Sequence, residues 1–243
     1  TIININSEDY EITKNKLKPK NCYLLNGVGL DLNQYKKLSQ KEILSKKKEL
    51  GLKENDFVVL MIAELNENKN QVQLIEAMEI LKDTYPEIKA ICVGEGDKLS
   101  ELQSEVKNRG LEGKVNFLGF RNDINELINI CNIGVLLSYR EGLPRNLMEL
   151  MACGKKVIAT NIRGCRDIVV DETVGELVEV GDYEATAKAI EEEYLYGNNE
   201  FIVSKEIEKY DVKTINEGLR LIYKELEEGG YYHKEGYAYS ANE

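Results

Sequence analysis

Histidine is almost absent from this chain of 243 residues, because its one histidine, His233, lies in the C-terminal tail. A zinc site that uses histidines, or a catalytic dyad that contains one, is therefore not expected within this chain. No stretch approaches the roughly 20 apolar residues that a membrane-spanning helix needs. The first residues, TIININSEDY, lack the basic and then apolar layout of a signal peptide. We expect a soluble, cytoplasmic chain whose start resembles the interior of a longer protein.

The cysteines show no metal-binding or disulfide pattern. They are odd in number and lack Cys-x-x-Cys spacing, and several lie in apolar runs. The sequence predicts buried small hydrophobic side chains in a reducing cytoplasm. They are Cys22, Cys92, Cys131, Cys153 and Cys165.

A dinucleotide-binding fingerprint is also missing. Gly94 and Gly96 follow a predicted strand, but Leu99 takes the place of the third glycine. A formal net charge of −11 argues against nucleic acid as a partner. The charge is uneven, since residues 11–53 hold eleven lysines against four acidic residues. We interpret this segment as a solvated, lysine-rich helix face, with contact to anionic membrane lipid as the alternative.

Short apolar, β-branched runs alternate with segments of helical period. One amphipathic stripe, for example, contains Leu74, Ile75, Met78 and Leu81. Apolar strands between amphipathic helices predict an α/β fold with a doubly wound, Rossmann-like parallel sheet, covered by helices on both faces, over about residues 39–200. The predicted strands are Phe57–Ile62, Ile88–Val93, Val115–Leu118, Ile133–Leu137, Lys156–Ala159 and Leu177–Val180.

Two carboxylates flank the predicted start of a helix after the strand at 133–137. Glu141 falls in the strand-to-helix loop, Pro144 suits a first helical turn, and Glu149 follows about 6 Å along the helix. Gly142 allows close approach of the backbone to a ligand. The first amides of a helix lack partners within it, so they form an anion site suited to a diphosphate. Carboxylates on either side are natural partners for sugar hydroxyls.

The spacing of these two carboxylates is weak evidence by itself. An acidic chain contains such pairs by chance, and spacing alone favours a loop carboxylate and a helix-surface carboxylate without a ligand. The context strengthens the interpretation, because a strand precedes the motif and Met-Ala-Cys-Gly and another buried strand follow it.

The segment EGLPRNLMELMACGKKVIATNIRG resembles the signature of family 4 of the retaining glycosyltransferases, the group 1 enzymes with the GT-B fold. NGVGLD, NENKNQVQLIEAM, CVGEGD and FLGFRND extend the resemblance over residues 21–228, and capsule and exopolysaccharide enzymes are the most similar subgroup. The resemblance implies the C-terminal half of a GT-B fold. Its parts would be a remnant of the N-terminal acceptor domain (1–20), an interdomain linker (21–38), a donor-binding domain (39–228) and an irregular tail (229–243).

The resemblance implies a role for each matching residue. Glu141 would contact the donor sugar, Glu149 would hold the ribose hydroxyls, and Lys69 would stabilise the leaving nucleoside diphosphate, which is electrostatic catalysis. Phe120 and Arg121 would lie against the base. The other donor-binding residues would be Gly94, Gly142, Leu143, Pro144, Arg145, Asn146 and Arg163.

One departure from the family concerns the residues that bind the donor diphosphate, here called the diphosphate clamp. Ala63 and Glu64 stand where many members have Gly-Arg, whose arginine helps to bind the diphosphate. A glutamate there repels phosphate, so another cation would have to act with Lys69. The candidates are Arg145, Arg163 and Arg166, and the Asn-Ile-Arg-Gly motif favours Arg163.

The resemblance implies a nucleotide-sugar donor, with uridine diphosphate sugars favoured, and a sugar or lipid-linked acceptor at the inner membrane face. It implies neither a metal nor a cofactor, and no Asp-x-Asp motif of the metal-dependent GT-A enzymes occurs. The amphipathic stripe of the final helix, Val212–Leu226, would need a cover in place of the missing N-terminal domain, such as self-association. Two alternatives remain open: a non-catalytic binding subunit that needs a separate acceptor domain, and a nucleotide-sugar epimerase of the same fold.

Overall fold

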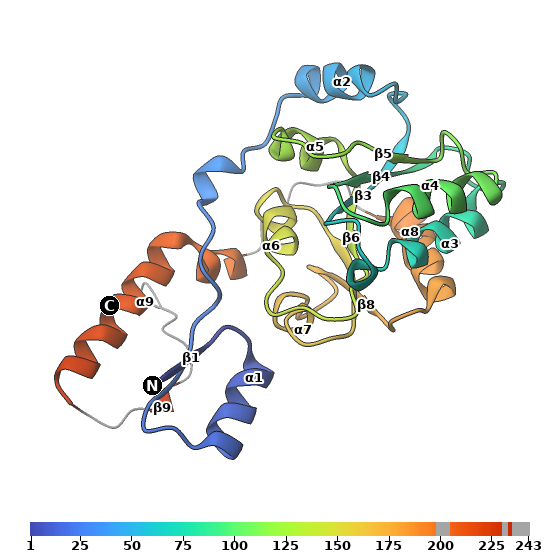
Figure 1. Ribbon diagram of the computed structural model, residues 1–243. Helices are drawn as coiled ribbons and strands as arrows, with labels where there is room; N and C mark the ends of the chain where they lie inside the picture. The colour runs from blue at the N-terminus through green and yellow to red at the C-terminus, as the bar shows by residue number, and fades with distance from the viewer. Residues whose placement is uncertain (198–204, 230–232, 235–243) are drawn as a thin grey trace.

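The computed structural model describes residues 1–197, 205–229 and 233–234. Its described residues form a large six-stranded parallel sheet and a small three-stranded sheet (Figure 1). The large sheet runs in the order β5-β4-β3-β6-β7-β8, and each adjacent pair of strands is parallel. Its strands are β3 (Phe57–Ile62), β4 (Ile88–Val93), β5 (Val115–Phe117), β6 (Ile133–Leu136), β7 (Val157–Thr160) and β8 (Gly175–Val178).

Helices cover both faces of the large sheet, which confirms the predicted doubly wound α/β fold (Figure 1). The helices around this sheet are α2 (Gln40–Glu49), α3 (Gln71–Leu81), α4 (Leu99–Asn108), α5 (Ile124–Ile130), α6 (Arg145–Ala152), α7 (Cys165–Ile168) and α8 (Tyr183–Tyr196).

Side chains of β3 alternate between two hydrophobic cores, one on each face of the sheet. Val58 and Leu60 pack with residues of α5, α6 and α7. Val59 and Met61 pack with residues of α3, α4 and α8.

The strand boundaries agree with the sequence prediction to within one residue, except in the edge strand β8. The bounds of β3 and β4 match the predicted residues, whereas β8 begins at Gly175 rather than at Leu177. Glycine and glutamate are uncommon in strands, so Gly175 and Glu176 did not signal one. They pair with Val157 and Ile158 of β7, so pairing with the neighbouring strand overrides local propensity.

The order of the large sheet reverses between β3 and β6. The chain winds outward from β3 through β4 to β5, then returns to the other side of β3 to form β6, β7 and β8. In open α/β sheets the loops diverge at such a reversal and leave a crevice at the carboxyl ends of the strands. The loops after β3 and β6 are therefore where a ligand site is expected.

The N-terminal segment forms a β-α-β unit outside the large sheet. Strand β1 (Ile2–Asn4) leads through α1 (Ser7–Ile12) and the π-helical turn η1 (Thr13–Leu17) into β2 (Cys22–Leu24), which pairs parallel with β1. Strand β2 corrects the expectation that 21–38 is only linker, and its Cys22 and Tyr23 are fully buried.

The tail at 229–243 was expected to be irregular, but its residues His233–Lys234 form β9 beside β2. Backbone pairing with β2 accounts for this strand, since the tail itself has no periodic pattern. Apart from Gly229 and β9, the tail lies outside the described residues.

The final helix, α9 (Val212–Glu227), agrees with its amphipathic pattern. It follows η4 (Lys205–Tyr210), and in Figure 1 α9 and α1 lie on opposite sides of the small sheet. Ile215 and Ile222 on its apolar stripe are buried within the same chain. The burial of these two side chains therefore does not depend on a second copy of the chain. Self-association stays a prediction, but an uncovered helix stripe no longer argues for it.

The lysine-rich segment 11–53 includes a lysine that makes structural contacts. The predicted solvated lysine face is wrong at Lys47, which is buried and donates to the carbonyls of Glu54 and Asp56. Its ammonium satisfies two backbone acceptors, and burial lowers the pKa of Lys47. No helix among the described residues combines the length and the hydropathy of a membrane span.

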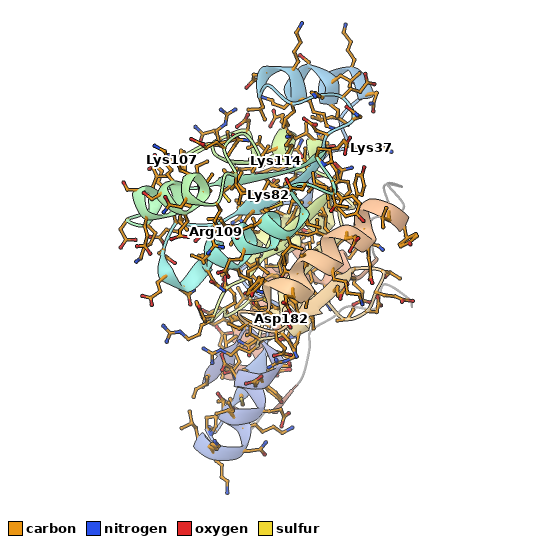
Figure 2. All side chains as sticks on the ribbon, turned by 90° about the vertical axis from the view of Figure 1, so that its right-hand side faces the viewer. Lys37, Lys82, Lys107, Arg109, Lys114 and Asp182 are labelled. Carbon is orange, nitrogen blue, oxygen red and sulfur yellow. The ribbon has the colours of Figure 1, made fainter. Side chains whose placement is uncertain are left out.

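Figure 2 shows another basic group, Lys82, Arg109 and Lys114, gathered where α3 and α4 end. Lys82 Nζ lies 2.8 Å from the Arg109 carbonyl oxygen, and Lys114 Nζ lies 3.2 Å from that of Lys82. Cations stabilise the carbonyl ends of helices, so these residues act in the fold.

Candidate functional site

The loops that follow β3 and β6 are held together by their backbones. The amide of Tyr139 donates to the carbonyl oxygen of Asn68 at 2.8 Å, and the Asn68 side chain donates to the Arg140 carbonyl at 3.1 Å. The loop after β3 contains the short helical turn η3 (Glu67–Lys69), which the Asn66 side chain caps. Asn68 was not singled out from the sequence, and its pairing with the β6 loop depends on the order of the strands.

Lys69 and Glu141, the two predicted catalytic residues, form an ion pair across these loops. Lys69 Nζ lies 2.5 Å from Glu141 Oε1, although 72 positions separate the residues in the chain. The side chains are 22% and 11% exposed, so both are largely, but not completely, removed from water. An ammonium and a carboxylate thus neutralise each other at the switch point.

Helix α6 begins at Arg145, next to the predicted start, but Pro144 is its N-cap rather than a residue of its first turn. Among the described residues, no hydrogen-bond acceptor faces the amides of Gly142, Leu143, Arg145 and Asn146. The Asn146 side chain donates to the Ile62 carbonyl at 2.7 Å, which fastens the helix start to the end of β3. This arrangement provides adjacent N–H donors, reinforced by the helix dipole, for an anion.

Glu149 lies one turn into α6 and is held from two directions. Its Oε1 accepts from Arg145 Nε at 2.9 Å and from the hydroxyl of Tyr35 at 2.7 Å. The carboxylate is 12% exposed, and Oε2 has no hydrogen-bond partner among the described residues. Oε2 is therefore available to accept a ligand hydroxyl.

Tyr35 comes from the segment after η2 (Leu32–Gln34), and sequence reasoning missed it because linker aromatics carry no periodic signal. Burial first, and then the hydrogen bond to Glu149, raise the pKa of the Tyr35 phenol above its usual range. The phenol therefore stays protonated and acts as a donor to the carboxylate.

The predicted nucleobase loops lie after β4 and β5. Gly94 has a φ of +139°, and a Cβ there would overlap the Ala63 carbonyl, so glycine is required for close packing against the end of β3. Gly94 also donates to the Gly119 carbonyl at 2.9 Å. The Phe120 ring is 67% exposed and available for stacking.

Arg121 is committed to a local ion-pair network. Its Nε donates to Asp123 Oδ1 at 2.7 Å, and Lys46 of α2 reaches the other oxygen of Asp123 at 2.9 Å. These hydrogen bonds, chiefly from Arg121, hold the pKa of Asp123 well below its usual range. A contact of Arg121 with a base stays a prediction, because its guanidinium already binds α2 and the β5–α5 loop.

The candidate arginines for the diphosphate clamp all have acidic partners. Arg145 pairs with Glu149, whereas Arg163 and Arg166 reach Asp9 and Glu8 of α1, each at 2.6 Å. Glu64, in the place of the family arginine, is exposed. Lys69 has an acidic partner as well, Glu141, and its ammonium lies between the loops of β3 and β6. Phosphate binding by Arg163 stays a prediction.

The loop that carries Arg163 nevertheless touches the helix start. Gly164 has a φ of +75°, and a Cβ at this position would lie 2.8 Å from the carbonyl carbon of Gly142 and overlap its oxygen. The loop after β6 therefore touches the β3 loop through Tyr139, Arg140 and Glu141 and the β7 loop through Gly142.

Known proteins resemble this chain over most of its length. A family model described as "Glycosyl transferases group 1" matches residues 42–210. The putative glycosyltransferase EpsD of Bacillus subtilis (strain 168) is 38% identical over 194 residues, which cover 79% of this chain and 51% of EpsD. The UDP-Gal:alpha-D-GlcNAc-diphosphoundecaprenol alpha-1,3-galactosyltransferase of Escherichia coli is 31% identical over 195 residues, covering 78% and 50% respectively.

A solved structure supports the same relationship. The crystal structure of HepE from Anabaena in complex with UDP and glucose has a TM-score of 0.75 and 29% identity, covering 83% of this chain and 56% of HepE. The chain spans about half the length of these relatives. Since the family match, the relatives and the shared GT-B fold agree, the chain belongs to the group 1 glycosyl transferases.

Proposed function

We propose that this chain is the donor-binding part of a retaining glycosyltransferase and that it holds a nucleoside diphosphate sugar at the β3–β6 switch point. The observation that carries the proposal is the group of partnerless amides at the start of α6, flanked by the Lys69–Glu141 pair and by Glu149. The amides suit the diphosphate, Glu149 suits the ribose, and Glu141 suits the transferred sugar. HepE, which has been crystallised with UDP-glucose, supports a uridine nucleotide.

The ion pair suggests how the donor enters. In the structure Lys69 neutralises Glu141 at 2.5 Å. When the donor binds, Lys69 turns to the diphosphate, and Glu141 is released to accept hydrogen bonds from sugar hydroxyls. As the glycosidic bond breaks, negative charge grows on the leaving diphosphate, and Lys69 and the amides stabilise it.

The whole protein would transfer the sugar to a lipid-linked or polysaccharide acceptor. Support comes from the Escherichia coli relative, whose name states a diphosphoundecaprenol-linked acceptor. A role in capsule or exopolysaccharide assembly, at the inner membrane face, belongs to the same proposal. The acceptor would bind to a region corresponding to the part of the relatives that this chain does not span.

The proposal is tested by calorimetric titration of the chain with uridine, guanosine and adenosine diphosphates, with free uridine as the control ligand. We expect uridine diphosphate to bind most tightly and uridine at least tenfold more weakly, because phosphate contacts to charged and amide donors supply much of the affinity. If none of the three diphosphates bound, the proposed function would be wrong.

Glu149 provides a second test, of the ribose contact. Replacing Glu149 with alanine should abolish the preference for uridine diphosphate over its 2′-deoxy analogue, which we expect to be about tenfold in the original chain. The ratio of the two affinities, measured by calorimetry, cancels effects common to both ligands. Glu149→Gln keeps one carbonyl acceptor and should retain part of the preference. An unaltered ratio in Glu149→Ala would remove this residue from the site.

A further inference from the structure

Asn6, at the junction of β1 and α1, connects the N-terminal unit to the donor loop. Its side chain is 1% exposed. As the N-cap of α1, its Oδ1 accepts from the Asp9 amide at 2.8 Å. Its Nδ2 donates to Asp9 Oδ2 at 2.8 Å and to the Gly142 carbonyl oxygen at 3.0 Å, across 136 positions of the chain. Every polar atom of this buried amide thus has a partner, and one of them is in the motif that flanks α6.

The bond to Gly142 determines the orientation of one peptide group. In a trans peptide the carbonyl and the following amide point in opposite directions. Because the Gly142 carbonyl points to Asn6, the Leu143 N–H points away from α1. That amide has no acceptor among the described residues.

The surrounding atoms oppose a flip of this peptide. Gly164 packs directly against the Gly142 carbonyl, because a Cβ at Gly164 would overlap that carbonyl oxygen. A flip would also leave the buried Asn6 Nδ2 without one acceptor, which is costly for a polar group out of water. The peptide is therefore held in one orientation before a ligand arrives.

Other contacts dock α1 against the same region. Asp9 and Glu8 pair with Arg163 and Arg166, and the Ser7 amide donates to Asp167 Oδ1 at 2.9 Å. These contacts hold the first turn of α1 against α7 and the loop that precedes it, so Asn6 approaches Gly142 from a fixed direction.

We propose that Asn6 is a positioning residue of the donor site: it aims the Leu143 amide at the distal phosphate of the nucleoside diphosphate. This inference rests on the proposed function. The order of groups along the motif supports the distal phosphate, since Leu143 lies beside Glu141, on the sugar side, and Glu149 lies on the ribose side. Asn6 thereby makes diphosphate binding depend on the docking of the β1–α1 unit.

The test compares uridine diphosphate with uridine monophosphate, which lacks the distal phosphate, as ligands of the chain. Asn6→Ser retains a good N-cap for α1 but is too short to reach Gly142. We expect its affinity for the diphosphate to fall about tenfold and that for the monophosphate to change less than twofold. Asn6→Thr, which also retains an N-cap oxygen but is too short to reach Gly142, should give the same selective loss. Glu8→Gln is the matched control, since it breaks another α1 contact without touching Gly142, and should leave both affinities unchanged.

Three results would overturn the inference: an unchanged diphosphate affinity in both Asn6 variants, an equal fall for the two nucleotides, or an equal loss in Glu8→Gln. The second and third would show that Asn6 acts only through the docking of α1. Thermal unfolding of each variant separates a loss of fold from a loss of binding. If the unmodified chain bound neither nucleotide, both the proposed function and this inference would fail. If the unmodified chain bound the diphosphate but one of the three results above were found, only the inference about Asn6 would fail.

Discussion

Replacing Lys69 with alanine should weaken the binding of uridine diphosphate about a hundredfold, equivalent to ~2.8 kcal/mol. The variant loses the ammonium that the structure places between the β3 and β6 loops. It also leaves Glu141, which is 11% exposed, as an uncompensated carboxylate beside an incoming diphosphate. Removal of one partner from a desolvated charge pair costs more than the pair itself contributes, because the other charge stays behind. Calorimetric titration measures the change.

Two further variants separate these contributions. Adding Glu141→Gln to Lys69→Ala removes the repulsion and should restore part of the lost affinity. Lys98→Ala is a matched control, because Lys98 is paired with Glu101 at 2.7 Å on the neighbouring β4–α4 connection. It should change the affinity less than twofold. A loss in Lys98→Ala as large as that in Lys69→Ala would mean that overall charge, rather than a contact, governs binding.

Replacing Gly164 with alanine should lower the free energy of unfolding by about 3 kcal/mol and also impair diphosphate binding. The added Cβ would overlap the Gly142 carbonyl oxygen, at a backbone φ of +75° that already disfavours alanine. Relief of the overlap requires a shift of the Gly142 loop, which carries the Leu143 amide and borders Glu141. Urea unfolding measures the first effect, and titration with uridine diphosphate measures the second.

Gly113 offers a control with almost the same φ. Its φ is +74°, but nothing lies within 4 Å of a Cβ placed there. Gly113→Ala should therefore cost only the conformational penalty of about 1 kcal/mol and leave binding unaltered. Equal destabilisation in the two variants would show that the contact between Gly164 and Gly142 contributes nothing.

The strands of the large sheet could be predicted because most of them carry their own signal. β3 is a short, continuous apolar run, and β4 is apolar apart from Lys89; such runs identify central parallel strands. β8 was misplaced because its first residues, Gly175 and Glu176, are accepted only through pairing with β7. β2 was also missed, because it lies in the predicted linker and is a strand only through its backbone pairing with β1.

The sequence by itself determined the alternation of strands and helices, the start of α6 near Pro144, and the kinds of residue that flank it. These features are local, because they depend on apolar period, on proline and on glycine. The order of the strands is not local. It brings β3 beside β6, and only then do Lys69 and Glu141 meet.

The tertiary structure also decided the partners of the charged groups. Tyr35 and Glu149 are 114 positions apart, Asn6 and Gly142 are 136 positions apart, and no periodic pattern links either pair. Arg163, whose binding to phosphate stays a prediction, pairs in the structure with Asp9, because docking of α1 brings that carboxylate beside it. Residue types and spacing limit what a site can contain. Which side chains meet, and which amides stay free for a ligand, depends on how distant segments pack.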